Sequence, residues 1–566
     1  MRNFVSFALF AIFTLQVSCI YRGPIGNFAN KNHQLDPNQA PHLLWPSPNS
    51  YTYGSSEIVI NDPCNFSFKL GIGLEAGDIQ QVFTAYKQYM FADAHCGSQA
   101  QDHAATRNNI LNFTIQDIGQ VQMDLGVDES YNLTVQDGSF QVYAKTYVGA
   151  LRALETFSQL VSKRQDPTTG LTTFFIPATP VVIQDFPRFA HRGFMLDTSR
   201  HFISKTNILK ILDGMMFSKL NVFHWHLADS DSFSFFFPSH PNLTKFGAFS
   251  SKQVYSQQDI QDIVNYAYVR GIRIIPELDS PAHVGGWAAA PEAAPLINCT
   301  VDGPFHGHTL GTPLGQINPT LNATYDLIKD LLNDLNTYFP WEFVHLGNDE
   351  VDPYCWNNTD IYNFMTKNNI KDFPGLFNYF VKRERELVNQ NKTRMYWLFP
   401  DTAAYLQFEP SDVLQWWGNT SGLMPQFDRF PNNKFILSNY DYFYFDCGFG
   451  DYFGSKSWCD PLHTWLQIYR FELNATQIQE HEGQILGLEA CLWSEMVNDA
   501  VVLDRAFPRA ASLGEKAWSS ALNEYTDTLS VFKRLNAWIS RNNERGVPTG
   551  PISSGFCELN PTKCFT

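Results

Sequence analysis

The chain lacks three features that would each define a class of protein. Its 566 residues carry 40 Lys and Arg against 56 Asp and Glu, a net charge of −16, and the basic residues form no stripe or tail. Nucleic acid is therefore excluded as a partner, because its phosphates need a basic surface. Beyond the N-terminal segment no apolar run approaches the roughly 20 residues of a membrane span, and no low-complexity tract occurs.

A complete set of metal ligands is also missing. His224-X-His226 and His306-X-His308 have the spacing of ligand pairs. No adjacent cysteine or third ligand block completes either pair, as a zinc site would require. We expect neither a metal nor another cofactor.

What is present begins with a secretory signature. In segment 1–19, Arg2 precedes an apolar run that ends at Val17, and small residues follow up to Cys19, which is the order of a signal peptide. We expect a protein of the secretory pathway, either secreted or lysosomal. Recurrent Asn-X-Ser/Thr sequons predict that it is a glycoprotein.

Ten cysteines fit that oxidising compartment. Cys19 lies at the expected cleavage point and Cys491 in an apolar run, which leaves eight for disulfide bonds. Sequence alone leaves their connectivity open. The pairings that we favour are Cys64 with Cys96, Cys299 with Cys355, Cys447 with Cys459 and Cys557 with Cys564.

Eight apolar, strand-like runs between residues 191 and 496 each end on acidic, basic or aromatic side chains. They are HRGFMLDTSRH, LNVFHWHLAD, GIRIIPELDSPAH, FVHLGNDE, RMYWLFPD, DVLQWWG, KFILSNYD and ILGLEACLWSE. Helical stretches separate several of them, as in SQQDIQDIVNYAYVRG, where Ser256 can cap the start and Gly271 ends the helix. This alternation predicts an α/β fold, a (β/α)8 TIM barrel with its chemistry at the C-terminal ends of the strands.

A small α+β domain is expected before the barrel, in residues 20–185. SEIVIND and NLTVQDGSFQVYAKT alternate apolar and polar residues, with a hairpin turn at Asp137-Gly138, and TYVGALRALETFSQLV has helical spacing. We place the catalytic barrel at 186–545 and a C-terminal tail, closed by a disulfide, at 546–566.

The fourth run ends on the adjacent carboxyl pair Asp349-Glu350. Neighbouring side chains diverge on an extended strand, so this pair cannot flank one glycosidic bond as two conventional glycosidase carboxylates do. Different roles follow: one group protonates a leaving group and the other stabilises a developing charge. An apolar, aromatic site favours a protonated carboxyl group, which suits Glu350 as the acid. Aromatic residues, 15% of the chain, gather at the strand ends and predict a carbohydrate ligand.

Five blocks together resemble the signature of the β-N-acetylhexosaminidases, glycoside hydrolase family 20. They are DTSRH, HWHLAD, PELDSPAH, HLGNDE and EACLWSE. DESYNLTV and GALRALETFSQL resemble the N-terminal domain of that family, so the similarity covers nearly the whole chain.

The resemblance implies a retaining exo-β-N-acetylhexosaminidase that removes terminal non-reducing N-acetyl-D-hexosamine. In that family the 2-acetamido oxygen of the substrate attacks the anomeric carbon and forms an oxazolinium intermediate. By the same resemblance Glu350 is the general acid and base, and Asp349 accepts a hydrogen bond from the acetamido N–H.

The resemblance also assigns polar substrate-binding groups. Arg200 and Glu495 bind sugar hydroxyls, and the planar fork of an arginine suits vicinal oxygens. Asp229 and His283 form a pair that relays to the catalytic glutamate. Asp279 is expected to hold other site residues in place without contacting the sugar.

Aromatic side chains complete the implied site. Trp397, Trp417 and Trp493 wall the acetamido pocket, Tyr444 donates to the acetamido oxygen, and Asp446 accepts from a sugar hydroxyl.

The segment 439–461 resembles the seventh-strand loop of chitooligosaccharide-degrading members of the family. There a tryptophan beside the second cysteine, here Trp458, stacks on the next sugar. Packing of the loop is the alternative role for this side chain. GlcNAc- or GalNAc-terminated glycans, chitin fragments and glycolipids all stay open as substrates. Whether the protein forms a homodimer also stays open.

Several positions depart from the family pattern. Asn348 stands where a second glycine is usual, Ser230 where a second aspartate is usual, and Ala282 where a glycine is common. WLFPD lacks the acidic residue that often follows Trp397. None of these changes removes a proposed catalytic group. The rival interpretations are a catalytically inactive, lectin-like barrel, which would be expected to lose Asp349 or Glu350, and a family-18-like chitinase, whose acidic motif is missing.

Overall fold

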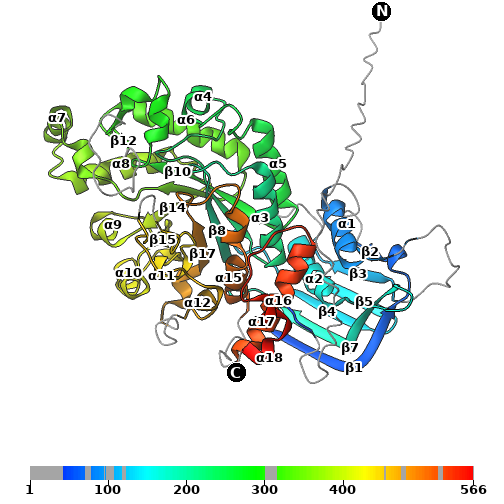
Figure 1. Cartoon of the computed structure of the whole chain (residues 1–566). Coiled ribbons are helices and arrows are strands. Elements are labelled where there is room, and N and C mark those ends of the chain that lie inside the picture. The colour runs from blue at the N-terminus through cyan, green and yellow to red at the C-terminus, as the bar shows by residue number, and fades with distance from the viewer. Residues whose placement is uncertain are drawn as a thin grey trace, which may run out of the picture. The chain divides into compact units, whose positions relative to one another are not determined.

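The eight predicted runs form the eight parallel strands of one closed barrel in the computed structural model (Figure 1). The strands are β8 (His191–Asp197), β9 (Val222–His226), β10 (Arg273–Ser280), β13 (Phe343–Gly347), β14 (Thr393–Leu398), β15 (Val413–Trp416), β16 (Lys434–Leu437) and β17 (Ile485–Leu492). Each strand pairs in parallel with its neighbours, and β17 pairs with β8 to close the ring. The predicted TIM barrel is confirmed.

The structure describes residues 42–70, 78–94, 96, 108–117, 123–299, 315–450, 454–472, 480–519 and 527–564. The predicted signal peptide and the His306-X-His308 pair lie outside these residues. Within the described part of the chain, no helix is long and apolar enough to cross a membrane.

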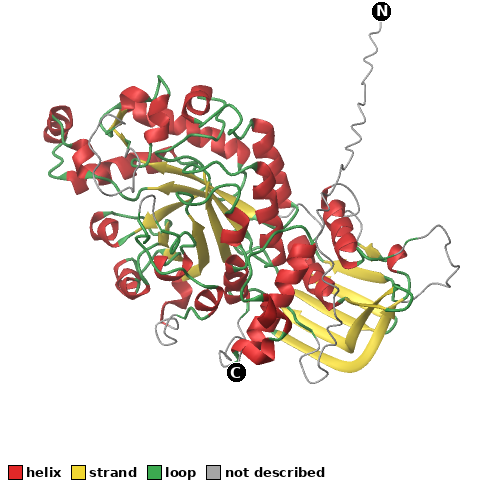
Figure 2. Ribbon diagram, in the orientation of Figure 1, coloured by secondary structure: helices red, strands yellow, loops and turns green. Residues whose placement is uncertain are grey.

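Helices surround the strands of the barrel (Figure 2). The longer ones are α3 (Lys205–Phe217), α5 (Gln257–Tyr268), α6 (Asn322–Tyr338), α8 (Phe373–Leu387) and α15 (Arg509–Trp518). The shorter ones are α4 (Pro241–Gly247), α7 (Thr359–Lys367), α9 (Pro400–Tyr405), α10 (Met424–Arg429), α11 (Tyr440–Phe443), α12 (Trp465–Tyr469) and α14 (Val502–Ala506). In α5 the Ser256 hydroxyl accepts the Asp259 N–H at 3.2 Å, and the Asp259 carboxylate accepts the Ser256 N–H at 3.1 Å. Gly271, with φ 68°, then turns the chain into β10.

An antiparallel-rich sheet precedes the barrel, in strand order β1-β7-β4-β5-β3-β2, with β6 paired to β7. Its elements are β1 (Ser50–Ile60), β2 (Ser67–Lys69), β3 (Ile110–Ile115), β4 (Tyr131–Gln136), β5 (Ser139–Ala144), β6 (Ser162–Gln165) and β7 (Thr172–Asp185), with α1 (Asp78–Met90) and α2 (Tyr147–Leu160). Gln136 pairs with Ser139 across the predicted Asp137-Gly138 turn, where Gly138 has φ 74°. The predicted α+β domain is confirmed, while its exact boundaries stay a prediction.

Helix α2 is buried along its whole length and packs on the sheet. Its Tyr147 and Arg152 side chains donate hydrogen bonds to the carbonyls of Val269 and Gly271, between α5 and β10. Glu129 lies 2.8 Å from Arg152 of α2 and 2.6 Å from Arg192 of β8. Asp185 of the sheet lies 2.8 Å from Lys219, which precedes β9. All these side chains are buried, so the sheet and the barrel share charged groups, and His42–Thr566 forms one compact unit.

The C-terminal part adds α16 (Thr528–Glu544), α17 (Gly555–Leu559) and α18 (Pro561–Cys564). The four favoured disulfides are all present: Cys64–Cys96, Cys299–Cys355, Cys447–Cys459 and Cys557–Cys564. Cys491 is a buried free thiol, as expected. A short strand pair, β11 (Ile297–Asn298) with β12 (Gln316–Ile317), lies in the long segment after β10.

Candidate active site

The predicted site residues all follow, or end, strands of the barrel at their C-terminal ends. Arg200 follows β8, Asp229 β9, His283 β10, Asp349 and Glu350 β13, Trp417 β15, Tyr444, Asp446 and Trp458 β16, and Trp493 and Glu495 β17, while Trp397 lies within the end of β14. This is the face at which TIM barrels build their active sites.

His283 connects the two members of the carboxyl pair. Its Nε2 lies 3.0 Å from Oε2 of Glu350, and its Nδ1 lies 3.7 Å from Oδ1 of Asp349. The side chain of Asp349 is almost fully buried, whereas that of Glu350 is 33% exposed. Glu350 is therefore the member of the pair that is more accessible to a ligand and to water.

The hydrogen-bond partner of His283 Nδ1 is Asp279, at 2.7 Å. Burial lowers the pKa of His283, but the carboxylates of Asp229 and Asp279 and the hydrogen bonds to Asp279 and Glu350 more than offset it, and the pKa is raised well above 6.5. An imidazolium with both N–H groups donating to carboxylates follows from this arrangement.

Asp229 lies near His283, with a carboxylate oxygen within 4.8 Å of a ring nitrogen, and makes its closest contacts with other side chains. Its carboxylate lies 2.9 Å from His226 Nε2 and 2.8 Å from Arg200. Burial raises its pKa, but the charges of Arg200, His283 and His226 bring it down to about 2. Asp229 thus acts on His283 through its charge, while Asp279, four residues before His283, makes the direct contact.

The backbone around Asp349 has an unusual conformation. Gly347, Asn348 and Glu350 have φ values of 68°, 69° and 49°, all in the left-handed region. A Cβ on Gly347 would come within 1.6 Å of Asp279 Oδ1, so only glycine fits there. Asparagine tolerates left-handed backbone better than most residues. Asn348 therefore keeps a conformation that suits the glycine usual at this position.

Asp349 sits in a strongly acidic, buried environment. Burial raises its pKa well above 3.8, the charges of Asp279 and Glu350 add to the rise, and His283 opposes it. Oδ1 of Asp349 has no hydrogen-bond partner among the described residues. This oxygen is positioned to accept a hydrogen bond from a ligand.

An aromatic cluster lies beside the pair. Its buried members are Met195, Trp397, Trp417, Tyr444, Cys491 and the Cys447–Cys459 disulfide, with Phe399, Tyr440 and Trp493 packed against them. The ring centroid of Tyr444 lies 6.4 Å from that of Trp417 and 6.3 Å from that of Trp493. The ring centroids of Trp397 and Trp493 are 5.9 Å apart. The three predicted tryptophans and the tyrosine thus form one apolar group.

Phe399 is a member of this cluster that the sequence did not predict. Its ring stacks on Trp417 at 4.1 Å with an interplanar angle of 11°. It lies in the WLFPD segment, where the acidic residue common in the family is missing. An aromatic side chain at this place holds the Trp417 ring by stacking.

Trp458 stands at the rim of the cluster and is 54% exposed. Its ring contacts Tyr440 at 5.2 Å, Tyr444 at 5.9 Å and the edge of Trp417 at 6.4 Å. The Cys447–Cys459 disulfide closes the loop directly beside it. A large apolar surface therefore faces solvent next to the buried aromatic cluster.

Three carboxylates surround the guanidinium group of Arg200. Its guanidinium lies 3.3 Å from Asp197, 2.8 Å from Asp229 and 3.7 Å from Asp231, and it stacks over the Trp493 ring at 5.0 Å. Asp231 was not predicted. It follows Ser230, which replaces the usual second aspartate, and supplies a carboxylate one position later.

Two further predicted carboxyl groups carry raised pKa values. Burial raises the pKa of Asp446 to about 8, and the nearby charge of Glu495 contributes to the rise. Burial also raises the pKa of Glu495, against the opposing charge of Arg200. Protonated carboxyl groups both donate and accept hydrogen bonds, as recognition of sugar hydroxyls requires.

Residues 189–521 match the family model described as "Glycosyl hydrolase family 20, catalytic domain", and residues 44–160 match the model "beta-acetyl hexosaminidase like". The chain belongs to glycosyl hydrolase family 20. The predicted β-N-acetylhexosaminidase, and with it a glycoside hydrolase, is confirmed.

Individual relatives agree with this family-20 assignment. The chain is 33% identical over 533 residues to the β-hexosaminidase subunit alpha of Mus musculus, covering 91% of this chain and 95% of that protein. It is 32% identical over 465 residues to the chitooligosaccharidolytic β-N-acetylglucosaminidase of Ostrinia furnacalis, covering 78% and 76%. The solved structure of a chitobiase from Flavobacterium johnsoniae superposes with a TM-score of 0.72 at 26% identity, covering 89% of this chain and 73% of that one.

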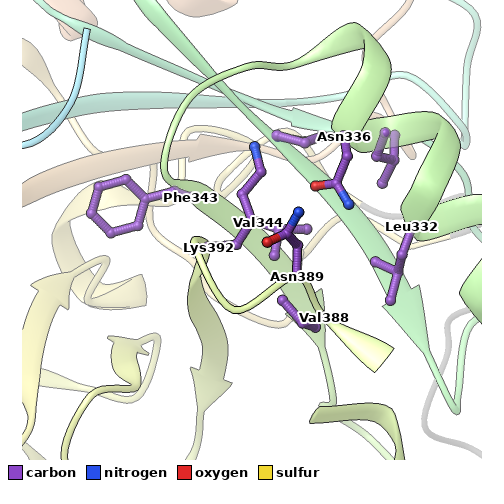
Figure 3. A pocket seen from close by; sticks show the side chains of 9 residues that line it. Leu332, Asn336, Phe343, Val344, Val388, Asn389 and Lys392 are labelled. Atoms are coloured by element: carbon purple, nitrogen blue, oxygen red, sulfur yellow. The ribbon is translucent and has the colours of Figure 1, made fainter. Parts of the chain in front are cut away.

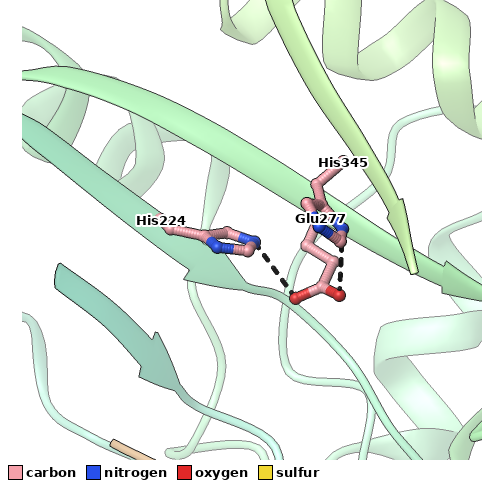
Figure 4. Close-up of side chains that lie close together, drawn as sticks. All are labelled: His224, Glu277 and His345. Atoms are coloured by element: carbon pink, nitrogen blue, oxygen red, sulfur yellow. Dashed lines mark ion pairs between the residues drawn. The ribbon is translucent and has the colours of Figure 1, made fainter. Parts of the chain in front are cut away.

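Beneath the family-20 site, the barrel interior holds a buried ion-pair network that the sequence did not predict. Glu277 lies 3.1 Å from His224 and 3.2 Å from His345. Figure 4 shows these two ion pairs. Glu489 lies 2.8 Å from His224 and 2.7 Å from His191. Burial lowers the pKa of His224, but the carboxylates of Glu489 and Glu277 raise it to about 9.

His224, Glu277 and His345 are close enough to hold a metal ion. Both oxygens of Glu277, however, already accept hydrogen bonds, one from the His226 ring and one from the Trp397 indole. The carboxylates raise the pKa values of His224 and His226, and these two histidines balance the buried negative charge. The network therefore orients Trp397 and the strand ends, and its chemistry is that of ion pairs.

A separate cavity lies at the opposite, N-terminal end of β13 (Figure 3). It is lined by Pro276, Leu332, Leu335, Asn336, Phe343, Val344, Val388, Asn389 and Lys392. Phe343 and Val344 begin the strand whose other end leads to Asp349. This cavity is thus not part of the site.

Proposed function

We propose that this family-20 enzyme is a retaining exo-β-N-acetylhexosaminidase in which the substrate's own acetamido oxygen is the nucleophile. The observation that supports it is the arrangement around His283. Glu350 is accessible on one side, and on the other lies Oδ1 of Asp349, which has no hydrogen-bond partner among the described residues. The pair comes from adjacent residues, so it cannot act from both faces of the sugar. One carboxyl group and a substrate group must therefore share the chemistry.

In the first step Glu350 protonates the glycosidic oxygen while the acetamido carbonyl oxygen attacks the anomeric carbon. The bond to the leaving group breaks and an oxazolinium ring forms on the face opposite the departing group. Asp349 accepts the acetamido N–H through Oδ1, which orients the group and stabilises its growing positive charge. Trp397, Trp417 and Trp493 exclude water from the acetamido group, and Tyr444 donates to its oxygen.

In the second step Glu350, now a carboxylate, takes a proton from water, and the water oxygen attacks the anomeric carbon. The oxazolinium ring opens, the acetamido group is restored, and two inversions give overall retention. The charged His283 imidazolium donates to Glu350 in both steps and holds its orientation.

Selectivity for terminal, non-reducing sugars is assigned to the carboxylate-rich side of the site. Arg200 donates to sugar hydroxyls while Asp229 and Asp231 hold its guanidinium, and Asp446 and Glu495 exchange hydrogen bonds with the same face of the sugar. These groups close one side of the pocket to a continuing chain.

Chito-oligosaccharides are the proposed preferred substrates. The exposed Trp458 ring, anchored by the adjacent Cys447–Cys459 disulfide, offers a stacking surface to a second sugar. The similarity to a chitooligosaccharidolytic enzyme supports this choice. The expected signal peptide and the four disulfides support a place in the secretory pathway, secreted or lysosomal.

The test compares the wild-type protein with Glu350→Gln on an aryl β-N-acetylglucosaminide, with and without an oxazoline-mimicking thiazoline. Thiazoline-sensitive hydrolysis that the substitution abolishes is the expected result. NMR of the first-formed anomer should give the β-configured product. A folded wild-type protein that binds the sugar without cleaving it would instead favour the lectin-like alternative, and an α-configured first product would contradict retention.

A further inference from the structure

Glu384 is a fully buried carboxyl group outside the site described above. It lies on α8, on the outer layer of the barrel, and is 0% exposed. Its oxygens accept hydrogen bonds from the Ser280 hydroxyl at 2.6 Å and from the Asn348 amide at 2.7 Å. The proposed mechanism gives it no role, so its burial needs another explanation.

Both partners of Glu384 belong to the backbone that carries the catalytic pair. Ser280 is the last residue of β10, and its carbonyl accepts the Asn348 N–H at 3.1 Å. Asn348 also donates its side-chain amide to the Leu346 carbonyl at 3.0 Å and directly precedes Asp349. Glu384 therefore connects the ends of β10 and β13 at the turn from which Asp349 and Glu350 project.

The turn itself needs such a connection. Asn348 adopts φ 69° and Glu350 φ 49°, conformations that are strained for residues with side chains and persist only where the surroundings enforce them. A glycine at position 348 would adopt this backbone without side-chain support. The asparagine instead uses its side chain, through Glu384, to hold the turn.

A merely structural role would not require a carboxyl group here. Burial raises the pKa of Glu384 to about 8, although the hydrogen bonds from Ser280 and Asn348 oppose the rise. An apolar side chain of similar size would fill the same buried space without the cost of burying a polar group. It would not, however, supply a hydrogen-bond acceptor that reaches the ends of both β10 and β13, as the Glu384 carboxyl group does.

We propose that Glu384 is a positioning residue for the catalytic pair, which fixes the turn before Asp349 and Glu350 by accepting hydrogen bonds from Ser280 and Asn348. The inference rests on the function proposed above, because it gives Glu384 a task only if Asp349 and Glu350 perform the reaction. Glu384 itself touches no substrate in this scheme.

The test measures kcat and KM of the whole protein for Glu384→Ala, Glu384→Gln, Asn348→Gly and Asn348→Gly/Glu384→Ala. Displacement of a reacting group by about 1 Å costs up to 100-fold, so Glu384→Ala should lower kcat by roughly 10- to 100-fold with little change in KM. Glu384→Gln keeps an acceptor and should recover most of kcat. In the Asn348→Gly background, Glu384→Ala should have a much smaller effect, because the bond to Asn348 is already gone and the glycine adopts the turn without it.

Val381→Ala is the matched control, since Val381 is buried on the same helix and has no polar contact with the turn. It should lower the unfolding temperature and leave kcat unchanged. If Glu384→Ala fails to fold, Ser280→Ala breaks one of the two bonds without changing position 348 and should lower kcat in the same direction. An unchanged kcat in folded Glu384→Ala, or equal losses for Glu384→Ala and Glu384→Gln that parallel the loss of stability, would overturn the inference.

The proposed function and the positioning role of Glu384 can be contradicted separately. Retained activity in Glu350→Gln would contradict the proposed function, whatever the Glu384 variants do. Loss of activity in Glu350→Gln, together with normal kcat in Glu384→Ala, would remove only the positioning role.

Discussion

Oε2 of Glu350 lies 3.0 Å from Nε2 of His283, and the other ring nitrogen of His283 lies 2.7 Å from Asp279. The imidazole therefore spans from a buried carboxylate to one that is one-third exposed. This geometry fixes the direction in which the accessible carboxyl group points. It also places a positive charge, held by buried carboxylates, next to the site of proton transfer.

Replacing His283 by asparagine should impair the chemical step more than binding. The substitution removes the imidazolium charge and the donor that orients Glu350, while the amide roughly fills the space. General acid–base catalysis contributes about 10²- to 10⁴-fold, so we expect kcat to fall by about 100-fold and KM to change less. Steady-state kinetics on an aryl glycoside measures both. A kcat within about threefold of wild type would contradict this role.

The plot of kcat/KM against pH should fall on its acid side, and this fall should begin well above pH 3.8. Burial and the charges of Asp279 and Glu350 raise the pKa of Asp349 well above 3.8, and only its carboxylate form carries the negative charge that stabilises the positive acetamido group. As pH falls through the raised pKa, Asp349 takes up a proton and kcat/KM should decline. Since kcat/KM reports groups of the free enzyme, a profile between about pH 3 and 8 tests this expectation. Activity that stays flat to below pH 3.8 would contradict it.

Trp458→Ala should separate oligomers from single-sugar substrates. Aryl glycosides end at the pocket and should keep their kcat/KM within about twofold. Chito-oligomers lose a stacking partner worth about 0.5–1.5 kcal/mol, so their kcat/KM should fall by roughly 3- to 10-fold. Phe246→Ala, another exposed aromatic side chain on the separate helix α4, is the control. Equal losses on both substrates would indicate that Trp458 only packs the loop.

Glu129→Gln should destabilise the protein and change its response to acid. Burial raises the pKa of Glu129, but Arg192 and Arg152 lower it to about 2. A depressed carboxyl pKa stabilises the fold above the unfolded value of about 4.3, and this contribution, about 3 kcal/mol, is lost as pH falls toward 2. Breaking a buried pair costs about 3–5 kcal/mol, so the free energy of unfolding at neutral pH should fall by that amount.

Denaturant unfolding of Glu129→Gln at several pH values between neutrality and about pH 3 provides the measurement. The variant should lose less stability on acidification than wild type does. Glu57→Gln breaks the exposed pair with Arg164 and serves as the control, with little expected effect. Parallel stability curves for Glu129→Gln and wild type would contradict the assignment.

The barrel could be predicted because its strands carry two independent patterns. Each apolar run is buried on both faces, so it reads as continuous hydrophobic sequence, and each ends abruptly on polar groups. The α5 helix and the Asp137-Gly138 hairpin were equally visible, because a cap, a periodic face and a turn dipeptide are local features. The adjacency of Asp349 and Glu350 was local as well.

The partners within the site could not be predicted in the same way. Asp229 and Asp279 both lie within reach of His283, and only the packing of two strand ends decides which one makes the hydrogen bond. A weaker signal was present for the buried network: His224 with His226, and Glu277 with Asp279, alternate along their strands and so share a face. Glu384 had no local signal, because its partners lie on two distant strand ends.

The buried ion pairs between the N-terminal sheet and the barrel limit how the chain can be truncated. A fragment that begins at residue 186 would retain Arg192 and Lys219 but lose Glu129 and Asp185, their counter-ions at 2.6 Å and 2.8 Å. Arg192 and Lys219, both fully buried in the whole protein, would then lack the carboxylates that neutralise them. Expression of the barrel alone, or its transplantation onto another N-terminal module, therefore requires those two positions to be redesigned first.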